Sequence, residues 1–264
     1  MSGPASSNKR RTIFRTSPSL LTPPRPLMTA SSRSPSTFVP RAKRYVLLPM
    51  STRFDDAIAA IDAANADDPF TVTYAVDGVE VTRPKELAHS ELMCEWVKTL
   101  DPDADDAQLL AARAHHLRRW SYPRTEQPEG RAGYLKWRTE ARKRHATLVG
   151  EILSGVGYGV DGDDTIERVQ ALVSKQGLGK GGLAAVDGRS PAVQVHEDSL
   201  CLVFLQTQFV PVATQLGDEK MIDVLVRTVP KMGPRGQAAA LALDLDPHCA
   251  SLVAAALERL GAEA

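Results

Sequence analysis

The chain has 264 residues with 32 basic and 32 acidic side chains, so its net charge is zero, and one domain of this size can bury a core without covalent staples. Its three cysteines include no C-x-x-C pair, which argues against a disulfide framework or a zinc ribbon and favours a reducing compartment. No run of eighteen apolar residues occurs, so the sequence predicts no membrane insertion.

The first fifty residues differ in charge from the rest. Residues 1–53 hold ten Lys or Arg and no acidic residue, whereas the remainder carries 22 basic and 32 acidic residues. A basic, acid-free segment rich in Ser, Thr and Pro is typical of a mitochondrial or plastid transit peptide, so we expect residues 1–49 to be a disordered leader. A disordered basic tail without a targeting role is the alternative. Initiation at Met50 would give a leaderless, cytoplasmic form.

Residues 50–264 are predicted to form a single, mainly α-helical domain. Phe54, Ile58 and Ile61 recur at helical spacing up to about residue 65. Residues 70–74 and 79–82 alternate in polarity about Asp77-Gly78 and predict one short β-hairpin. Residues 176–192, rich in Gly, predict a long exposed loop. Further helices are expected at 85–100, 105–120, 130–156, 163–175, 193–214, 218–230, 234–243 and 247–260.

Four polar residues fall on the apolar faces of these helices, namely His89, His116, His145 and Asp198. Residues three, four and seven apart share a helix face, and an unpaired polar group in a core costs free energy. Three imidazoles and a carboxylate that converge inside a helical domain predict a divalent-metal site. The alternative is that each histidine is a hydrogen-bonded core residue and that Asp198 pairs with an arginine. The other histidines, His115, His196 and His248, are expected at the surface.

A basic stretch with interleaved aromatic residues predicts an anionic ligand. Residues 113–144 hold ten basic and three acidic side chains. We expect Arg142, Lys143 and Arg144 to form a solvated face. The planar guanidinium groups nearer the proposed centre suit phosphate or carboxylate. The predicted ligand-binding residues are Arg118, Arg119, Trp120, Arg124, Tyr134, Trp137 and Arg138.

Several short motifs carry a family resemblance. Ala111-Arg-Ala-His-His-Leu-Arg-Arg-Trp120, Arg131-Ala-Gly-Tyr-Leu-Lys-Trp-Arg138, His145-Ala146 and Glu197-Asp198 resemble the family called domain of unknown function 4202, from about Met50 to the C-terminus. This resemblance implies no activity. The chain is more weakly similar to the HD superfamily of helical metal-dependent phosphohydrolases, whose metal ligands are matched in order by His89, His116 and Asp198, with His145 as an additional ligand. The HD-family aspartate that follows the central histidine is Leu117 here.

The leading hypothesis from these patterns is an HD-like, metal-dependent phosphohydrolase that acts on a small phosphorylated or nucleotide-like substrate. A divalent metal ion would be held by His89, His116, His145 and Asp198. Arg119, Arg124 and Arg138 would bind the phosphate, and Glu197 would carry a proton. The rival hypothesis is a non-catalytic RNA-binding or nucleotide-binding module that stacks bases on Trp120 or Trp137. An interaction scaffold is the third.

Overall fold

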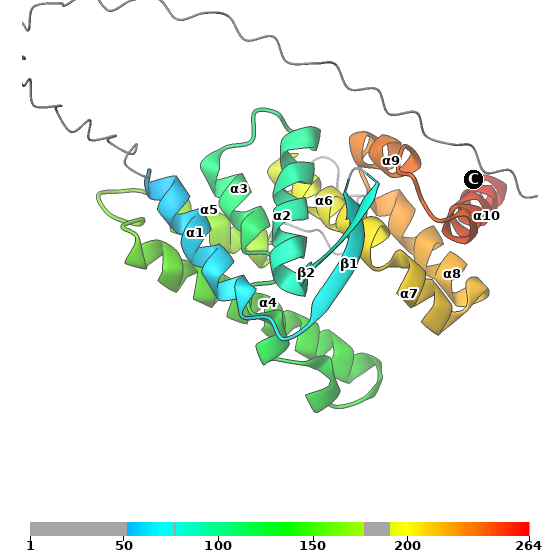
Figure 1. The fold of residues 1–264 in the computed structure, drawn as a ribbon, viewed down its shortest axis with the longest axis horizontal. Coiled ribbons are helices and arrows are strands. Elements are labelled where there is room, and N and C mark those ends of the chain that lie inside the picture. Colours follow the sequence, from blue (N-terminus) through cyan, green and yellow to red (C-terminus); the bar gives the residue numbers. More distant parts are fainter. Residues whose placement is uncertain (1–51, 77, 177–190, 264) are drawn as a thin grey trace, which may run out of the picture. The chain divides into compact units, whose positions relative to one another are not determined.

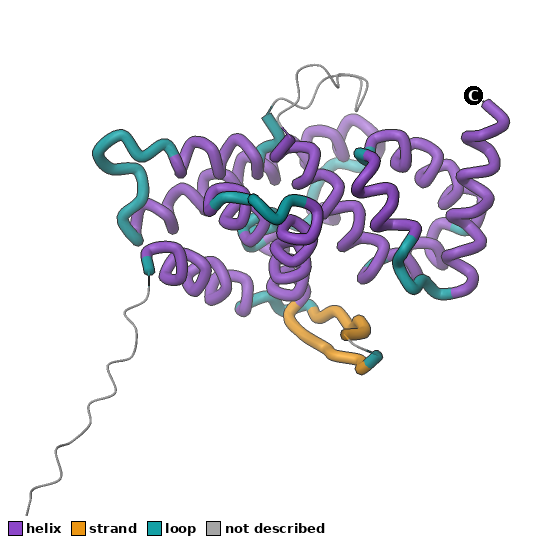
Figure 2. Tube along the Cα trace, turned by 90° about the horizontal axis from the view of Figure 1, so that it is seen from above, coloured by secondary structure: helices purple, strands orange, loops and turns teal. Residues whose placement is uncertain are grey.

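The computed structural model describes residues 52–76, 78–176 and 191–263, and the description of the fold is confined to them. They form a mainly helical domain with one antiparallel pair of strands, which confirms the predicted fold class (Figures 1 and 2). The prediction for residues 1–49 lies outside the described residues, and so does that for nearly all of the loop at 176–192.

Most of the predicted helices are present within a few residues of their expected bounds. The elements of the described residues are α1 (Arg53–Ala66), β1 (Thr71–Val76), β2 (Val79–Pro84), α2 (Lys85–Leu100), α3 (Asp106–Arg113), α4 (Gly130–Gly155), α5 (Thr165–Val173), α6 (Pro191–Thr207), α7 (Phe209–Leu216), α8 (Asp218–Thr228), α9 (Pro234–Leu241) and α10 (Pro247–Glu263). Short 3-10 turns lie at Arg119–Ser121, Arg124–Glu126 and Val229–Lys231. Two predictions, the helices at 105–120 and 193–214, are corrected below.

The hairpin leads directly into α2 and fixes how that helix begins. β1 and β2 pair in register from Thr71 with Pro84 to Val76 with Val79, and the Thr73 and Thr82 hydroxyl oxygens lie 2.8 Å apart. The Lys85 backbone N–H donates to the Phe70 carbonyl at 2.8 Å. Figure 2 shows the strands in orange at the edge of the helices. The first turn of α2 is therefore held in place by the sheet.

Apolar burial joins the helices through several clusters. α1, α3, α4 and α5 share one cluster, in which Ile61, Leu110, Val149 and Leu153 are fully buried. A second cluster joins α7, α8 and α10 around Phe209. α2 lies against both α3 and α6, as Figure 1 shows, and contributes to a third cluster. The side chains that α2 and α3 direct toward α4 and α6 thus meet inside the protein.

The helix predicted at 105–120 ends early, and this difference shapes the site. α3 begins with a capping box in which Asp105 Oδ1 accepts from the Gln108 N–H at 3.0 Å, and it ends at Arg113. Beyond it the Arg118 N–H donates to the Asn65 side chain at 3.2 Å, and Arg118 has a φ of 51°. This tertiary bond stabilises a turn over residues 114–118 in place of another helical turn. Neighbouring side chains in this turn no longer follow helical spacing.

The helix predicted at 193–214 is broken at Gln208, where α6 and α7 meet at 74°. Among the described helices, no single one is long and apolar enough to cross a membrane. The bent pair of α6 and α7 passes that test by length and composition only.

The shared cluster of α1, α3, α4 and α5 makes a direct prediction about stability. Leu110→Ala removes a fully buried side chain and should lower the free energy of unfolding by about 3 kcal/mol, because a cavity replaces the lost contacts. Leu135→Ala, at a position 47% exposed on α4, should change it by less than about 0.5 kcal/mol. Urea unfolding of both variants measures the difference. Equal losses would contradict the assignment of this core.

Candidate functional site

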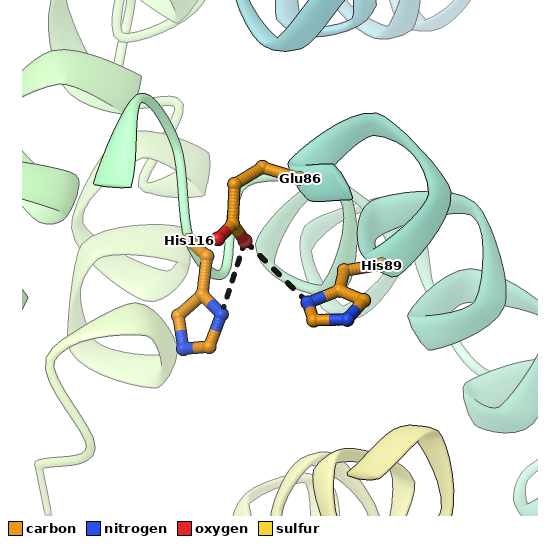
Figure 3. A group of neighbouring side chains, drawn as sticks. All are labelled: Glu86, His89 and His116. Carbon is orange, nitrogen blue, oxygen red and sulfur yellow. Dashed lines mark ion pairs between the residues drawn. The ribbon is translucent and has the colours of Figure 1, made fainter. Parts of the chain in front are cut away.

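A buried carboxylate lies between two imidazoles (Figure 3). Glu86 Oε2 is 3.5 Å from His89 Nδ1 and 3.3 Å from His116 Nδ1. Glu86 and His89 are three residues apart in the first turn of α2 and so share one helix face, while His116 comes from the turn after α3. One ligand atom from each of the three residues lies within 4.8 Å of the others. We call these residues the Glu86 triad.

Two neighbouring side chains contact the far ring nitrogen of His89. The Thr207 hydroxyl donates to the Val203 carbonyl at 2.7 Å, so toward His89 Nε2, 3.1 Å away, it can only accept. The Gln208 amide nitrogen lies 3.2 Å from the same ring nitrogen and can donate a hydrogen bond to it. His89 Nε2 thus faces one acceptor and one donor, so that these two contacts fit either tautomer of a neutral His89.

Glu86 Oε2 is itself fully buried and has no hydrogen-bond partner among the described residues. An ionised carboxylate oxygen without a partner is stabilised by a proton or a metal ion held between it and the adjacent ring nitrogens. The donor atoms of the triad are thus arranged for a positive charge that they share.

The charge states follow from burial. Burial raises the pKa of Glu86, but the adjacent ring nitrogens of His116 and His89 lower it further, so that the net pKa lies well below its usual range. Burial and the nearby Arg119 lower the pKa of His116 to about 3, although Glu86 opposes this shift. An ionised carboxylate and a neutral imidazole are the forms that bind metal.

His145 extends the triad along α4. Its Nδ1–H donates to the Leu117 carbonyl at 2.9 Å, which leaves Nε2 as an acceptor. This Nε2 is buried and has no partner within the described part of the chain. Burial lowers the pKa of His145 to about 4, and its ring centre lies 6.0 Å from that of His116. The second lone pair is therefore available next to the triad.

A second buried polar cluster corrects the expectation that His115 and His196 are at the surface. Both are buried, and His115 Nδ1 lies 2.7 Å from His196 Nε2. The turn that ends α3 lets His115 and His116 point inward together, with ring centres 4.3 Å apart. Beside His196, the buried Lys175 forms an ion pair with Glu197. His248 is exposed, as predicted.

A cavity of about 470 Å³ adjoins both clusters. His116 and His145 line it, together with Arg119, Arg138 and Arg142. No Asp or Glu is among its described lining residues, and no hydrogen bond or ion pair is formed by these three guanidinium groups within the described residues. Arg142 was expected on a solvated face with Lys143 and Arg144; it is half-buried and lines the cavity, whereas the other two are exposed.

Some of the other predicted ligand-binding residues line the cavity, and the rest lie outside it. Tyr134 and Trp137 line the cavity, and Trp137 donates its indole N–H to the Tyr122 carbonyl at 2.9 Å while Arg119 lies over its ring at 4.7 Å. Trp120 and the exposed Arg118 are not among the lining residues. Arg124 donates to the carbonyl oxygens of Gln127 and Gly130 and so stabilises its own loop.

Asp198, predicted as the fourth metal ligand, is placed against the start of α9. Its carboxylate oxygens accept from the Gly233 backbone N–H at 3.1 and 3.2 Å and from the Gln194 amide at 2.7 Å. A Cβ at Gly236 would meet Asp198 Cγ at 2.5 Å, so the helix start lies directly on the carboxylate. Of the predicted ligand residues, His116 lies next to His89 and His145, with ring centres 6.3 and 6.0 Å apart, whereas Asp198 contacts other groups; Glu86 joins the histidines.

The fold and the buried cluster define a helical protein with a histidine-rich interior. One protein family matches most of this helical domain. Residues 55–253 match the family described as Domain of unknown function (DUF4202), and the chain belongs to this family. Comparison with curated proteins and with solved structures gives no match.

Buried neutral histidines make stability depend on pH. Burial and Lys175 lower the pKa of His196 from 6.5 to about 4, so the unfolded chain takes up a proton first as the pH falls. This stability is present above about pH 6.5 and is lost toward pH 4. The expected loss is about 2 kcal/mol per neutral histidine between pH 7 and pH 5.

Urea unfolding of the parent, His196→Gln and His248→Gln, each in a chelator, tests this dependence. His196→Gln should flatten the fall in unfolding free energy between pH 7 and pH 5, whereas the exposed His248→Gln should leave it unchanged. Parallel curves for all three proteins would contradict the buried neutral state of His196.

Proposed function

We propose that this protein is a metal-dependent phosphohydrolase, with the metal ion bound by the Glu86 triad. The observation that carries the proposal is the buried Glu86 Oε2, which has no hydrogen-bond partner among the described residues and faces two imidazole nitrogens beside an arginine-lined cavity. Two imidazoles and one carboxylate form a donor set suited to Zn²⁺ and to other divalent transition metals.

The HD-like hypothesis changes in one respect. In the sequence comparison, Asp198 filled the place of the late carboxylate ligand, but its oxygens bind the backbone of Gly233. Glu86 supplies the carboxylate instead, from the same helix turn as His89. The proposed chemistry stays metal-assisted phosphate hydrolysis, with a ligand set that differs from the HD order.

The residues around the triad have distinct proposed roles. A divalent ion there would supply Lewis-acid polarisation of a phosphoryl oxygen. Arg119, Arg138 and Arg142 bind the remaining phosphate oxygens, because guanidinium groups suit this geometry and lack an acidic partner in the described lining. His145 Nε2 accepts a hydrogen bond from the attacking water and orients it. Glu197, predicted as a proton carrier, is paired with Lys175 and stabilises that cation.

The RNA-binding alternative has less support from the geometry. Base stacking needs an accessible aromatic face, but Trp137 is buried and has Arg119 over its ring. Trp120 is half-buried and outside the cavity lining. The unpaired arginines point to a compact anion more than to a strand of nucleic acid.

Metal content tests the ligand set. The purified full chain, loaded with Zn²⁺ and desalted, should retain about one equivalent of metal. Glu86→Gln and His116→Ala should lose it, since each removes a ligand atom. Asp198→Asn should keep it, because the amide oxygen can still accept from Gly233.

Elemental analysis measures the metal, and circular dichroism with urea unfolding confirms that each variant is folded. Retention by Glu86→Gln together with loss from Asp198→Asn would support the ligand set predicted from the sequence and contradict ours. A folded parent without retained metal would contradict both.

Adjacent arginines provide a matched test of catalysis. Arg119→Gln should lower kcat/KM for p-nitrophenyl phosphate by about 100-fold, because a charged donor to the phosphate is lost. Arg118→Gln removes an exposed guanidinium 3.9 Å from Asp67 and should leave kcat/KM nearly unchanged. Steady-state kinetics with added Zn²⁺ or Mn²⁺ measure both. Equal effects of the two substitutions would contradict the proposed phosphate site.

A further inference from the structure

The cavity has a cationic end and an apolar wall. Arg119, Arg138 and Arg142 occupy the cationic end, next to the Glu86 triad. The remaining lining comes mostly from α6, α8, α9 and α10 and is apolar, with Phe204, Leu225 and Val253 among it. A ligand that fills this space must satisfy both surfaces, with its anionic group at one end only.

The apolar wall continues to side chains that are exposed. Leu241 on α9 is 64% exposed and Leu257 on α10 is 36% exposed, and both line the same cavity. Large apolar side chains in contact with water at the edge of a cavity are unfavourable, and an apolar ligand bound there would cover them. This arrangement suits a chain that extends from the cationic end toward α9 and α10.

Two polar side chains of the wall, one on α8 and one on α9, already form hydrogen bonds. Thr228 donates its hydroxyl to the Val224 carbonyl at 2.7 Å. The Gln237 amide donates to the carbonyl oxygens of Val229 and Met232 at 3.1 and 3.0 Å, which uses both of its hydrogens. Thr228 and Gln237 therefore have no hydrogen left to donate to a nucleobase or a sugar, and the apolar side chains that make up most of the wall suit hydrocarbon better.

We infer that the cavity binds phosphate monoesters of a single apolar chain, with the phosphate among the arginines and the chain along α6, α8, α9 and α10. This inference rests on the proposed function for the identity of the anionic group, and it narrows the substrate class from small phosphorylated compounds to amphiphilic ones. It differs from the nucleotide-like substrate expected from the sequence.

A chain-length series tests the inference by calorimetry on the full chain in a chelator. The ligands are inorganic phosphate and methyl, butyl and octyl phosphate, with octanol as the uncharged control. Each buried CH₂ should tighten binding by about fourfold, so octyl phosphate should bind roughly 100-fold or more tighter than butyl phosphate. Octanol should bind more weakly than octyl phosphate. An affinity that does not change with chain length would overturn the inference.

Substitution of exposed leucines by glutamate, inside and outside the cavity, tests where the apolar chain of the ligand lies. Leu241→Glu and Leu257→Glu should weaken octyl phosphate binding at least tenfold, because the chain would meet a carboxylate, and should weaken binding of inorganic phosphate far less. Leu135→Glu alters an exposed leucine that does not line the cavity and should change neither. Equal effects of all three substitutions would overturn the placement of the chain.

The outcomes separate this inference from the proposed function. Hydrolysis of p-nitrophenyl phosphate with no dependence of binding on chain length would overturn the inference alone. Steep chain-length dependence with no hydrolysis of any ester would support the inference and contradict the enzyme. Binding to phosphatidic acid vesicles without binding of octyl phosphate would replace the single-chain ligand with a lipid surface and so overturn the inference.

Discussion

A carboxylate that is buried without a hydrogen-bond partner requires a positive charge nearby, and this requirement organises the interior of the protein. Glu86 Oε2 is in this position among the described residues, with imidazole nitrogens at 3.3 and 3.5 Å. Burying an ionised group without compensation costs several kcal/mol. A shared proton or a metal ion can compensate. The proposed function assigns this role to a metal ion, which an ionised carboxylate and neutral imidazoles can bind.

The surrounding fold holds these groups in place from several directions. The hairpin and Asp68, whose carboxylate accepts from the Glu86 N–H at 2.9 Å, fix the first turn of α2. Asn65 and His145 stabilise the turn after α3 through the Arg118 N–H and the Leu117 carbonyl. Thr207 at the end of α6 orients His89. Residues far apart in the chain thus hold the side chains of the triad in position, and the arginines of the cavity lie beside them.

Much of the helical architecture could be predicted from the sequence because apolar periodicity is a local property. The same periodicity placed His89 and His145 inside, since their neighbours three and four residues away are apolar. The end of α3 could not be predicted in this way. Neither Gly nor Pro lies between Arg113 and Trp120, and the turn depends on the tertiary bond from Arg118 to Asn65. His115 and His196 were therefore expected at the surface.

Two carboxylates show the limit of pattern analysis at the site. Glu86 was not predicted, because an acidic residue in the first turn of a helix is commonly a solvated favourable charge. Its spacing of three residues from His89 is the signal that could have revealed it. Asp198 lies on an apolar face as expected, but its partner is the backbone of Gly233, which no side-chain pattern reveals. Polar residues on apolar faces thus identify buried groups without identifying their partners.

X-ray absorption spectroscopy of the zinc-loaded full-length protein tests the central claim most directly. The account predicts a zinc ion with two imidazole nitrogens at about 2.0–2.1 Å and a carboxylate oxygen at a similar distance, and loss of one imidazole from the spectrum of His89→Ala. A zinc ion with sulfur ligands, or one surrounded by water oxygens alone, would contradict the claim that the Glu86 triad binds metal.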